Sequence, residues 1–146
     1  MKANPSPKAA RLLNELLECE LSAISTYSHA LEKLSLTRMA TELSRFKDNH
    51  EAAAEILTQQ IRSLGGTPVT SAGVWGKRPQ DRQEFMGLVA QLDALTEKER
   101  HSLYRYREVL SDDCLDYASR ELIQEKLLPR TSAHHHRILE LLREDD

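Results

Sequence analysis

Residues 16–34 read LLECELSAISTYSHALEKL, a stretch with the apolar spacing of a bundle helix and one acid in the middle of its apolar face. Its apolar side chains recur at alternating spacings of four and three residues, which places them along one seam of an α-helix. Extended back by one turn, this seam consists of Leu13, Leu17, Glu20, Ile24, Tyr27, Leu31 and Leu34. Glu20 occupies a position where leucine is expected, so the sequence predicts a buried carboxylate.

The rest of the chain continues the helical pattern and predicts an all-α fold. Residues 8–64 contain neither glycine nor proline, and strand-like alternation is absent from both halves. Because 57 residues exceed an ordinary globular helix, we expect a break near residues 35–37, where Thr37 can cap a new helix, and another at Asp112 or Asp113. The prediction is a single-domain bundle over residues 1–146, with residues 1–7 disordered and helices at about 8–34, 38–64, 80–110 and 114–143.

The glycine-rich segment at residues 65–79 is the long connection of this bundle. It has 15 residues, which can extend over about 50 Å, whereas a hairpin between neighbouring helices needs far fewer. A helix of 27 residues is about 40 Å long, so the segment can travel the whole length of the bundle. We therefore expect a crossover that leaves the second and third helices pointing in the same direction.

Each of the other helices also carries one polar residue on its apolar seam. His50 takes this place on the second helix and Glu99 on the third. On the fourth helix Pro129 removes an amide hydrogen and resets the register, with a break or kink expected within residues 125–130 and the next stretch starting at Arg130 to Thr131. Two registers are then open, and a histidine points inward in both: Ser132, His135, Leu139 and Leu142, or Thr131, His134, Ile138 and Leu141.

These polar residues are expected to meet in the bundle core. Charged side chains are rarely buried unless they are paired, because removing an ion from water costs several kcal/mol. Glu20, His50 and Glu99 each lie about halfway along their helices, so helix geometry allows contact. The predicted metal-ligand set is Glu20, His50, Glu99 and His135, with His134 as the alternative to His135.

The first helix resembles that of bacterioferritins and rubrerythrins, in the ferritin-like superfamily. Within LLNELLECELSAISTYSHA, Glu20 is followed seven residues later by Tyr27, and Glu99 and Tyr106 repeat this spacing. The segment NHEAAAEILTQQIRSLGGTP is similar to the end of the second helix in the same group. The likeness covers about residues 10–143 and is strongest to uncharacterised bacterial ferritin-like proteins that carry a domain of unknown function. It implies a ferritin-like four-helix bundle in which Tyr27 and Tyr106 support the metal ligands.

The chain departs from the superfamily at the positions of two ligands. Ferritin-like di-iron sites take a Glu from each of two helices and a Glu-x-x-His from each of the other two. Lys47 stands three residues before His50, and Thr131 or Ser132 stands three before the inward histidine. The site is therefore predicted to be a degenerate di-iron site that holds at most one ion. Either the acids are held by tyrosine hydroxyls and a protonated His50, or one Fe, Mn or Zn ion is bound, and whether the protein is an enzyme stays open.

Composition narrows the function classes further. The chain has 20 Lys and Arg residues and 23 Asp and Glu residues. The resulting net charge of −3 argues against a nucleic-acid binder. The sequence has no apolar run near the length of a membrane span and no leader-like start, so we expect a cytoplasmic protein without a membrane partner. The two cysteines, Cys19 and Cys114, form no metal-binding pattern and receive no role. The expected partner is a second copy of the chain, in a homodimer.

Overall fold

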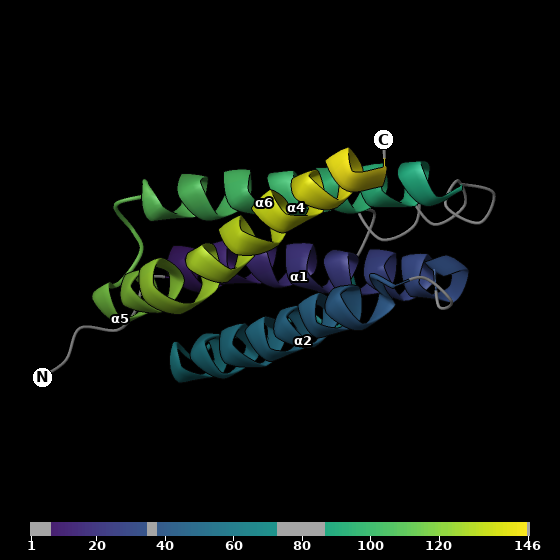
Figure 1. The fold of residues 1–146 in the computed structure, drawn as a ribbon. Helices are drawn as coiled ribbons and strands as arrows, with labels where there is room; N and C mark the ends of the chain where they lie inside the picture. Colours follow the sequence, from purple (N-terminus) through teal and green to yellow (C-terminus); the bar gives the residue numbers. More distant parts are fainter. Residues whose placement is uncertain (1–6, 35–37, 73–86, 146) are drawn as a thin grey trace, which may run out of the picture.

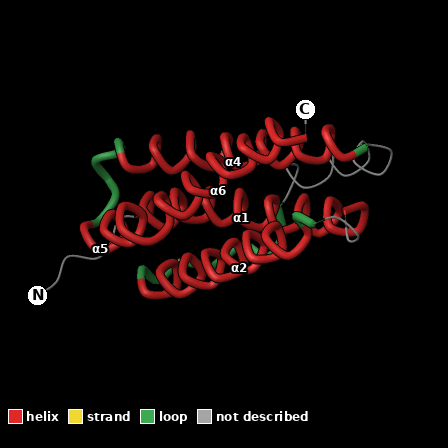
Figure 2. Tube along the Cα trace, in the orientation of Figure 1, coloured by secondary structure: helices red, strands yellow, loops and turns green. Residues whose placement is uncertain are grey.

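The computed structural model describes residues 7–34, 38–72 and 87–145. Helices make up most of these ranges, and the described residues include no strand (Figures 1 and 2). The helical segments are α1 (Pro7–Leu34), α2 (Ala40–Ser63), α4 (Leu88–Leu110), α5 (Tyr117–Leu122), the π-helical turn η2 (Ile123–Leu127) and α6 (Leu128–Asp145). The protein is an all-α four-helix bundle, in which α5, η2 and α6 together form the fourth helix.

The helices run in the order that the long crossover predicts. Glu20 contacts Tyr106 while Tyr27 contacts Glu99, so α1 and α4 are antiparallel. The α1–α2 pair is also antiparallel, which leaves α2 and α4 pointing the same way, as Figure 1 shows. The prediction of parallel second and third helices is therefore confirmed. The start of the crossover is held against α1, because the Asn14 side chain accepts a hydrogen bond from the Val69 N–H and donates one to the Thr67 carbonyl.

The predicted helix boundaries need several corrections. Pro7 was expected to be disordered but begins α1, where proline is tolerated because the first N–H of a helix has no intrahelical partner. The last helical stretch begins at Tyr117, not at residue 114, because the Asp116 side chain caps it by accepting the Ser119 N–H at 3.0 Å. It ends at Asp145. The third helix is observed from Leu88, after extended Gly87. Residues 1–6, the expected break at 35–37 with Thr37, and residues 73–86, which include the end of the crossover, lie outside the described residues.

Two glycines end α2 and turn the chain into the crossover. Gly65 has φ of +79°, a conformation that residues with a Cβ rarely adopt. The Gly65 N–H bonds the Arg62 carbonyl and the Gly66 N–H bonds the Ile61 carbonyl, each at 2.9 Å, which is the Schellman pattern. A Cβ on Gly66 would lie 2.8 Å from the Cβ of Ala10. Glycine at this position therefore allows the end of α2 to approach α1.

The fourth helix contains one extra residue in the π-helical turn before Pro129. The Leu128 N–H bonds the Ile123 carbonyl five residues back, so the helix continues while its hydrogen-bond ladder shifts. The predicted discontinuity is thus a π turn rather than a break, and the following α-helix begins at Leu128, not at Arg130 or Thr131. The buried residues on this helix are Ser119, Ile123, Leu127, Thr131, His134, Ile138 and Leu141. If one residue between Ile123 and Leu127 were removed, the buried residues would again be spaced alternately by four and three residues.

The register after the π turn places one histidine of the run 134–136 in the core. His134 is 3% exposed, whereas His135 is only partly buried, so the register with His135 inward is wrong. The inward set is the second of the two predicted registers. The polar residues then form a layer between two apolar clusters, one around Leu17, Leu57 and Ile123 and the other around Leu43, Leu92 and Ile138.

Candidate metal centre

Three predicted residues meet in the centre of the bundle. Glu20 and Glu99 are fully buried on α1 and α4, and His50 on α2 is 1% exposed. The His50 Nδ1 lies 2.6 Å from Glu20 Oε2, and its Nε2 lies 2.5 Å from Glu99 Oε1. The three side chains thus form a bridge of two carboxylates joined by one imidazole.

The geometry of this bridge relates the charge on His50 to the charges of the two acids. A neutral imidazole has one N–H and one lone pair, and an ionised carboxylate can only accept hydrogen bonds. Both ring nitrogens face carboxylate oxygens at hydrogen-bond distance, so with Glu20 and Glu99 ionised both nitrogens donate and His50 is an imidazolium. Its positive charge compensates the two acids at the position where a cation is needed.

The electrostatics of the cluster agree with this protonation state. Burial lowers the pKa of His50, but the charges of Glu20 and Glu99 and their hydrogen bonds outweigh it and raise the pKa to about 10. Burial raises the pKa of Glu99, whereas the charge of His50, the nearby His134 ring and the hydrogen bond with His50 lower it to about 2. At neutral pH the His50–Glu99 pair is therefore an ion pair.

Two tyrosines complete the bridge in a crossed arrangement. The Tyr27 hydroxyl on α1 donates to Glu99 Oε1 on α4, and the Tyr106 hydroxyl on α4 donates to Glu20 Oε1 on α1, each at 2.6 Å. Burial, followed by the neighbouring carboxylates, raises the pKa of both phenols well above the usual value, so both remain protonated donors. The equal spacing from Glu20 to Tyr27 and from Glu99 to Tyr106 produces this two-fold relation between antiparallel helices.

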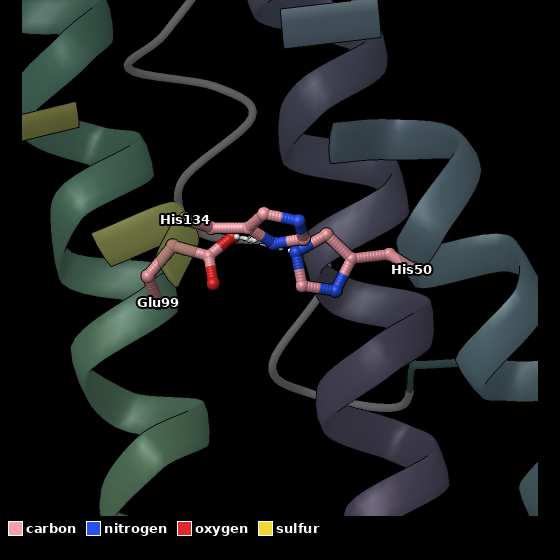
Figure 3. Close-up of side chains that lie close together, drawn as sticks. All are labelled: His50, Glu99 and His134. Carbon is pink, nitrogen blue, oxygen red and sulfur yellow. Dashed lines mark hydrogen bonds and ion pairs between the residues drawn. The ribbon is translucent and has the colours of Figure 1, made fainter. Parts of the chain in front are cut away.

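His134 approaches the bridge from the fourth helix (Figure 3). Its Nδ1 lies 3.5 Å from Glu99 Oε1, beyond the usual range of a hydrogen bond, and its ring is stacked on Phe46 with centroids 4.3 Å apart. Within the described residues, His134 Nδ1 and Glu99 Oε2 are buried without a hydrogen-bond partner. One ligand atom from each of His50, Glu99 and His134 lies within 4.8 Å of the others, a separation that suits one metal ion.

The positions of the two missing carboxylates are filled by residues that do not bind metals. Lys47 is partly buried and its amine lies 3.7 Å from Glu51, as expected for a residue that reaches water from the flank of the seam. Thr131 is 3% exposed and supplies no carboxylate. The donor set therefore fits a single ion and does not fit a pair of ions.

A single ion would also have to displace the His50 proton. A four-coordinate metal holds nitrogen and oxygen ligands at about 2.0–2.2 Å, which separates two ligand atoms by about 3.3 Å. The His50 Nε2 and Glu99 Oε1 are only 2.5 Å apart, so they share a proton in this geometry. Metal binding would require deprotonation of His50 and a widening of this contact.

Asn49 contacts the cluster without having been predicted as a site residue. Its Nδ2 lies 3.0 Å from His134 Nε2 in a partly buried position. The residue lies off the apolar seam, and the spacing rule selects only seam positions. In the sequence, the one indication that Asn49 belongs to the site is its position directly before the buried His50.

Comparison with known proteins places the fold and the family. The family model described as Domain of unknown function (DUF2383) matches residues 8–112. A structure of bacterioferritin from Rhodobacter capsulatus, described as having a metal-free dinuclear site and a heme iron in a crystallographic special position, matches with a TM-score of 0.76 and 22% identity, covering 98% of this chain and 87% of that chain. That likeness establishes the ferritin-like fold. No curated protein matches the sequence.

Proposed function

Because this chain belongs to the family described as Domain of unknown function (DUF2383), we propose its function from the buried cluster. The proposal is a ferritin-like bundle protein with a degenerate two-metal site, which acts without dinuclear metal chemistry and is not an enzyme. It would work through association with itself or with a partner protein. We also propose that this chain is related to rubrerythrins.

One observation carries this proposal: His50 lies between Glu20 and Glu99 and bonds both. Both of its nitrogens are engaged by carboxylate oxygens, and both carboxylates also receive a tyrosine hydroxyl. An imidazolium that is hydrogen-bonded to two acids performs the charge compensation that a metal would otherwise provide. The cluster then joins α1, α2 and α4 through one polar network.

Metal content of the purified protein tests the proposal. The protein should be prepared without chelator and without nickel resin, because the adjacent His134, His135 and His136 could collect metal from a column. We expect elemental analysis to find well under one Fe, Mn or Zn per chain, and chelator to leave the unfolding temperature unchanged. Two tightly bound ions per chain would contradict the proposal.

A second candidate is a protein that holds one Fe, Mn or Zn ion for redox or metal handling. The convergence of His50, Glu99 and His134, with Glu99 Oε2 and His134 Nδ1 lacking hydrogen-bond partners, favours it. In this case His50, Glu99 and His134 would hold the ion, with Glu20 as a further carboxylate, and the ion would supply Lewis-acid or one-electron chemistry. One ion per chain, lost on Glu20→Gln and with chelator lowering the unfolding temperature, would select this candidate.

The location and the oligomeric state of the protein are also part of the proposal. Among the described residues no helix is both long enough and apolar enough to span a membrane. We propose a cytoplasmic homodimer that binds neither nucleic acid nor membrane. Sedimentation equilibrium of the purified protein should give twice the chain mass, and a concentration-independent monomer would contradict the dimer.

A further inference from the structure

The contact between Asn49 and His134 indicates which ring nitrogen of His134 carries the proton. The Asn49 Nδ2 faces His134 Nε2 at 3.0 Å. An amide nitrogen only donates hydrogen bonds, so Nε2 must accept with its lone pair. In a neutral ring the proton then belongs to Nδ1, the nitrogen that points toward Glu99.

This tautomer prevents His134 from binding a metal. A metal needs the lone pair of a ring nitrogen, and Nδ1 is the nitrogen 3.5 Å from Glu99 Oε1. A proton on Nδ1 occupies that lone pair and gives this buried nitrogen a carboxylate acceptor to face, although the 3.5 Å distance is longer than that of a full hydrogen bond. The stacked Phe46 ring and the burial of His134 restrict movement of the ring out of this position.

The opposite tautomer needs an acceptor at the place of the Asn49 amide nitrogen. If Asn49 turned its amide by half a rotation, its Oδ1 would accept a proton from Nε2 and Nδ1 would offer its lone pair to the cluster. An aspartate at position 49 could only accept, so it would favour this second tautomer. Partners of this kind, which orient a ligand through its other nitrogen, change metal affinity by about 10- to 100-fold.

We propose that Asn49 is a positioning residue that fixes the tautomer of His134 and thereby keeps the buried cluster closed to a metal ion. The inference rests on the proposed function, in which the cluster is held by protons rather than by an ion. It assigns a specific cause to that state: the identity of residue 49, in addition to the loss of carboxylates at Lys47 and Thr131.

The first test reads the tautomer directly. Long-range ¹H–¹⁵N NMR of protein labelled at histidine should show His134 with a protonated Nδ1 and a lone pair on Nε2. A wild-type spectrum with the proton on Nε2 would overturn the assignment without the need for any variant. This result is independent of metal content, because a chain that binds one ion could be stripped with chelator before the spectrum is recorded.

The second test uses Asn49→Asp with a charge-matched control. Lys47→Gln lowers the net charge by the same amount within one turn of the helix but does not contact His134 in the described structure. In calorimetric titration with Zn²⁺, Asn49→Asp should bind at least about tenfold more tightly than wild type, whereas Lys47→Gln should change the affinity much less. Equal gains in the two variants would show that charge alone is responsible and would overturn the role of Asn49.

The two failures can be told apart. If the wild type binds an ion tightly while the stripped protein keeps Nδ1 of His134 protonated, the proposed metal-free function fails and the Asn49 assignment stands. If the tautomer is reversed while the purified protein contains no metal, the assignment fails and the proposed function stands.

Discussion

The Tyr106 hydroxyl lies 2.6 Å from Glu20 Oε1, a contact between residues that are 86 positions apart in the chain. Its counterpart joins Tyr27 to Glu99, 72 positions apart, so each tyrosine supports the acid of the opposite helix. The two acids differ in one respect. Tyr27 and His50 both contact the same oxygen of Glu99, Oε1. Tyr106 and His50 contact different oxygens of Glu20, Oε1 and Oε2.

This difference predicts unequal effects of removing the two hydroxyls. Tyr106→Phe should lower the free energy of unfolding by about 1.5–3 kcal/mol, because it takes a hydrogen bond from a buried charged acceptor. Tyr27→Phe should cost less, since His50 still donates to the same oxygen of Glu99. Urea unfolding measures both, with the exposed Tyr104→Phe as a control that should be near neutral. A larger loss for Tyr27→Phe would show that the two acids are not distinguished in this way.

Stability should depend on pH in opposite directions on the two sides of a plateau. The pKa of His50 is raised from 6.5 to about 10, so its contribution is complete below pH 6.5 and is lost as the pH rises toward 10. The pKa of Glu99 is lowered from 4.5 to about 2, so its contribution is complete above pH 4.5 and is lost as the pH falls toward 2. The contribution of this pair should therefore be greatest between pH 4.5 and 6.5.

A pH series of denaturant titrations checks this profile. The variant His50→Gln should lack the alkaline loss of stability between pH 6.5 and 10 that the wild type shows. If the wild type and the variant lost stability equally in that range, the titrating group would be a different one.

Removing His50 alone should lower the stability more than removing the whole bridge. His50→Leu leaves two acids buried without their shared cation and should cost about 3–5 kcal/mol. The triple variant Glu20→Gln, His50→Leu, Glu99→Gln removes the charges together and should recover part of that loss. Chemical unfolding of both proteins is the measurement, and a triple variant less stable than His50→Leu alone would contradict the view of the bridge as compensated charge.

The π turn should be removable only together with Pro129. Deletion of Glu125, an exposed residue of the turn, brings the buried positions back to alternating spacings, so the register of His134 should be kept. Pro129 would then lie in a regular helix and clash with a carbonyl, at a cost of about 3 kcal/mol that Pro129→Ala relieves. Thermal unfolding should show the deletion with Pro129→Ala to be more stable than the deletion alone. Deletion of Ala133 is the control, because it shifts every later seam residue and should be strongly destabilising.

Much of the bundle could be predicted from the spacing of apolar residues. The seams of α1, α2 and α4 place Glu20, His50 and Glu99 correctly because each seam is read through a regular α-helix. The register of the fourth helix stayed open in the sequence, because one extra residue in the π turn interrupts the alternation of four and three residues. Pro129 indicates where a helix is disturbed, but it does not say whether the chain breaks, kinks or widens by a residue.

The protonation state of the site could not be predicted from the spacing of residues, for a different reason. A seam shows that Glu20, His50 and Glu99 meet, but the charge on His50 follows from both of its nitrogens facing carboxylates, which only distances reveal. Asn49 was missed because its contact with His134 depends on the direction of a side chain that leaves the seam. The identity of Lys47, by contrast, already predicted from sequence that the donor set lacks a carboxylate.

The protonation state of His50 tests the account most directly. Histidine-labelled protein, prepared without chelator or nickel resin, can be examined by long-range ¹H–¹⁵N NMR at pH 8, where an ordinary histidine is neutral. The bridge between Glu20 and Glu99 predicts protons on both Nδ1 and Nε2 of His50. A neutral His50 with a lone pair on one nitrogen, or a nitrogen bound to a metal, would contradict the account.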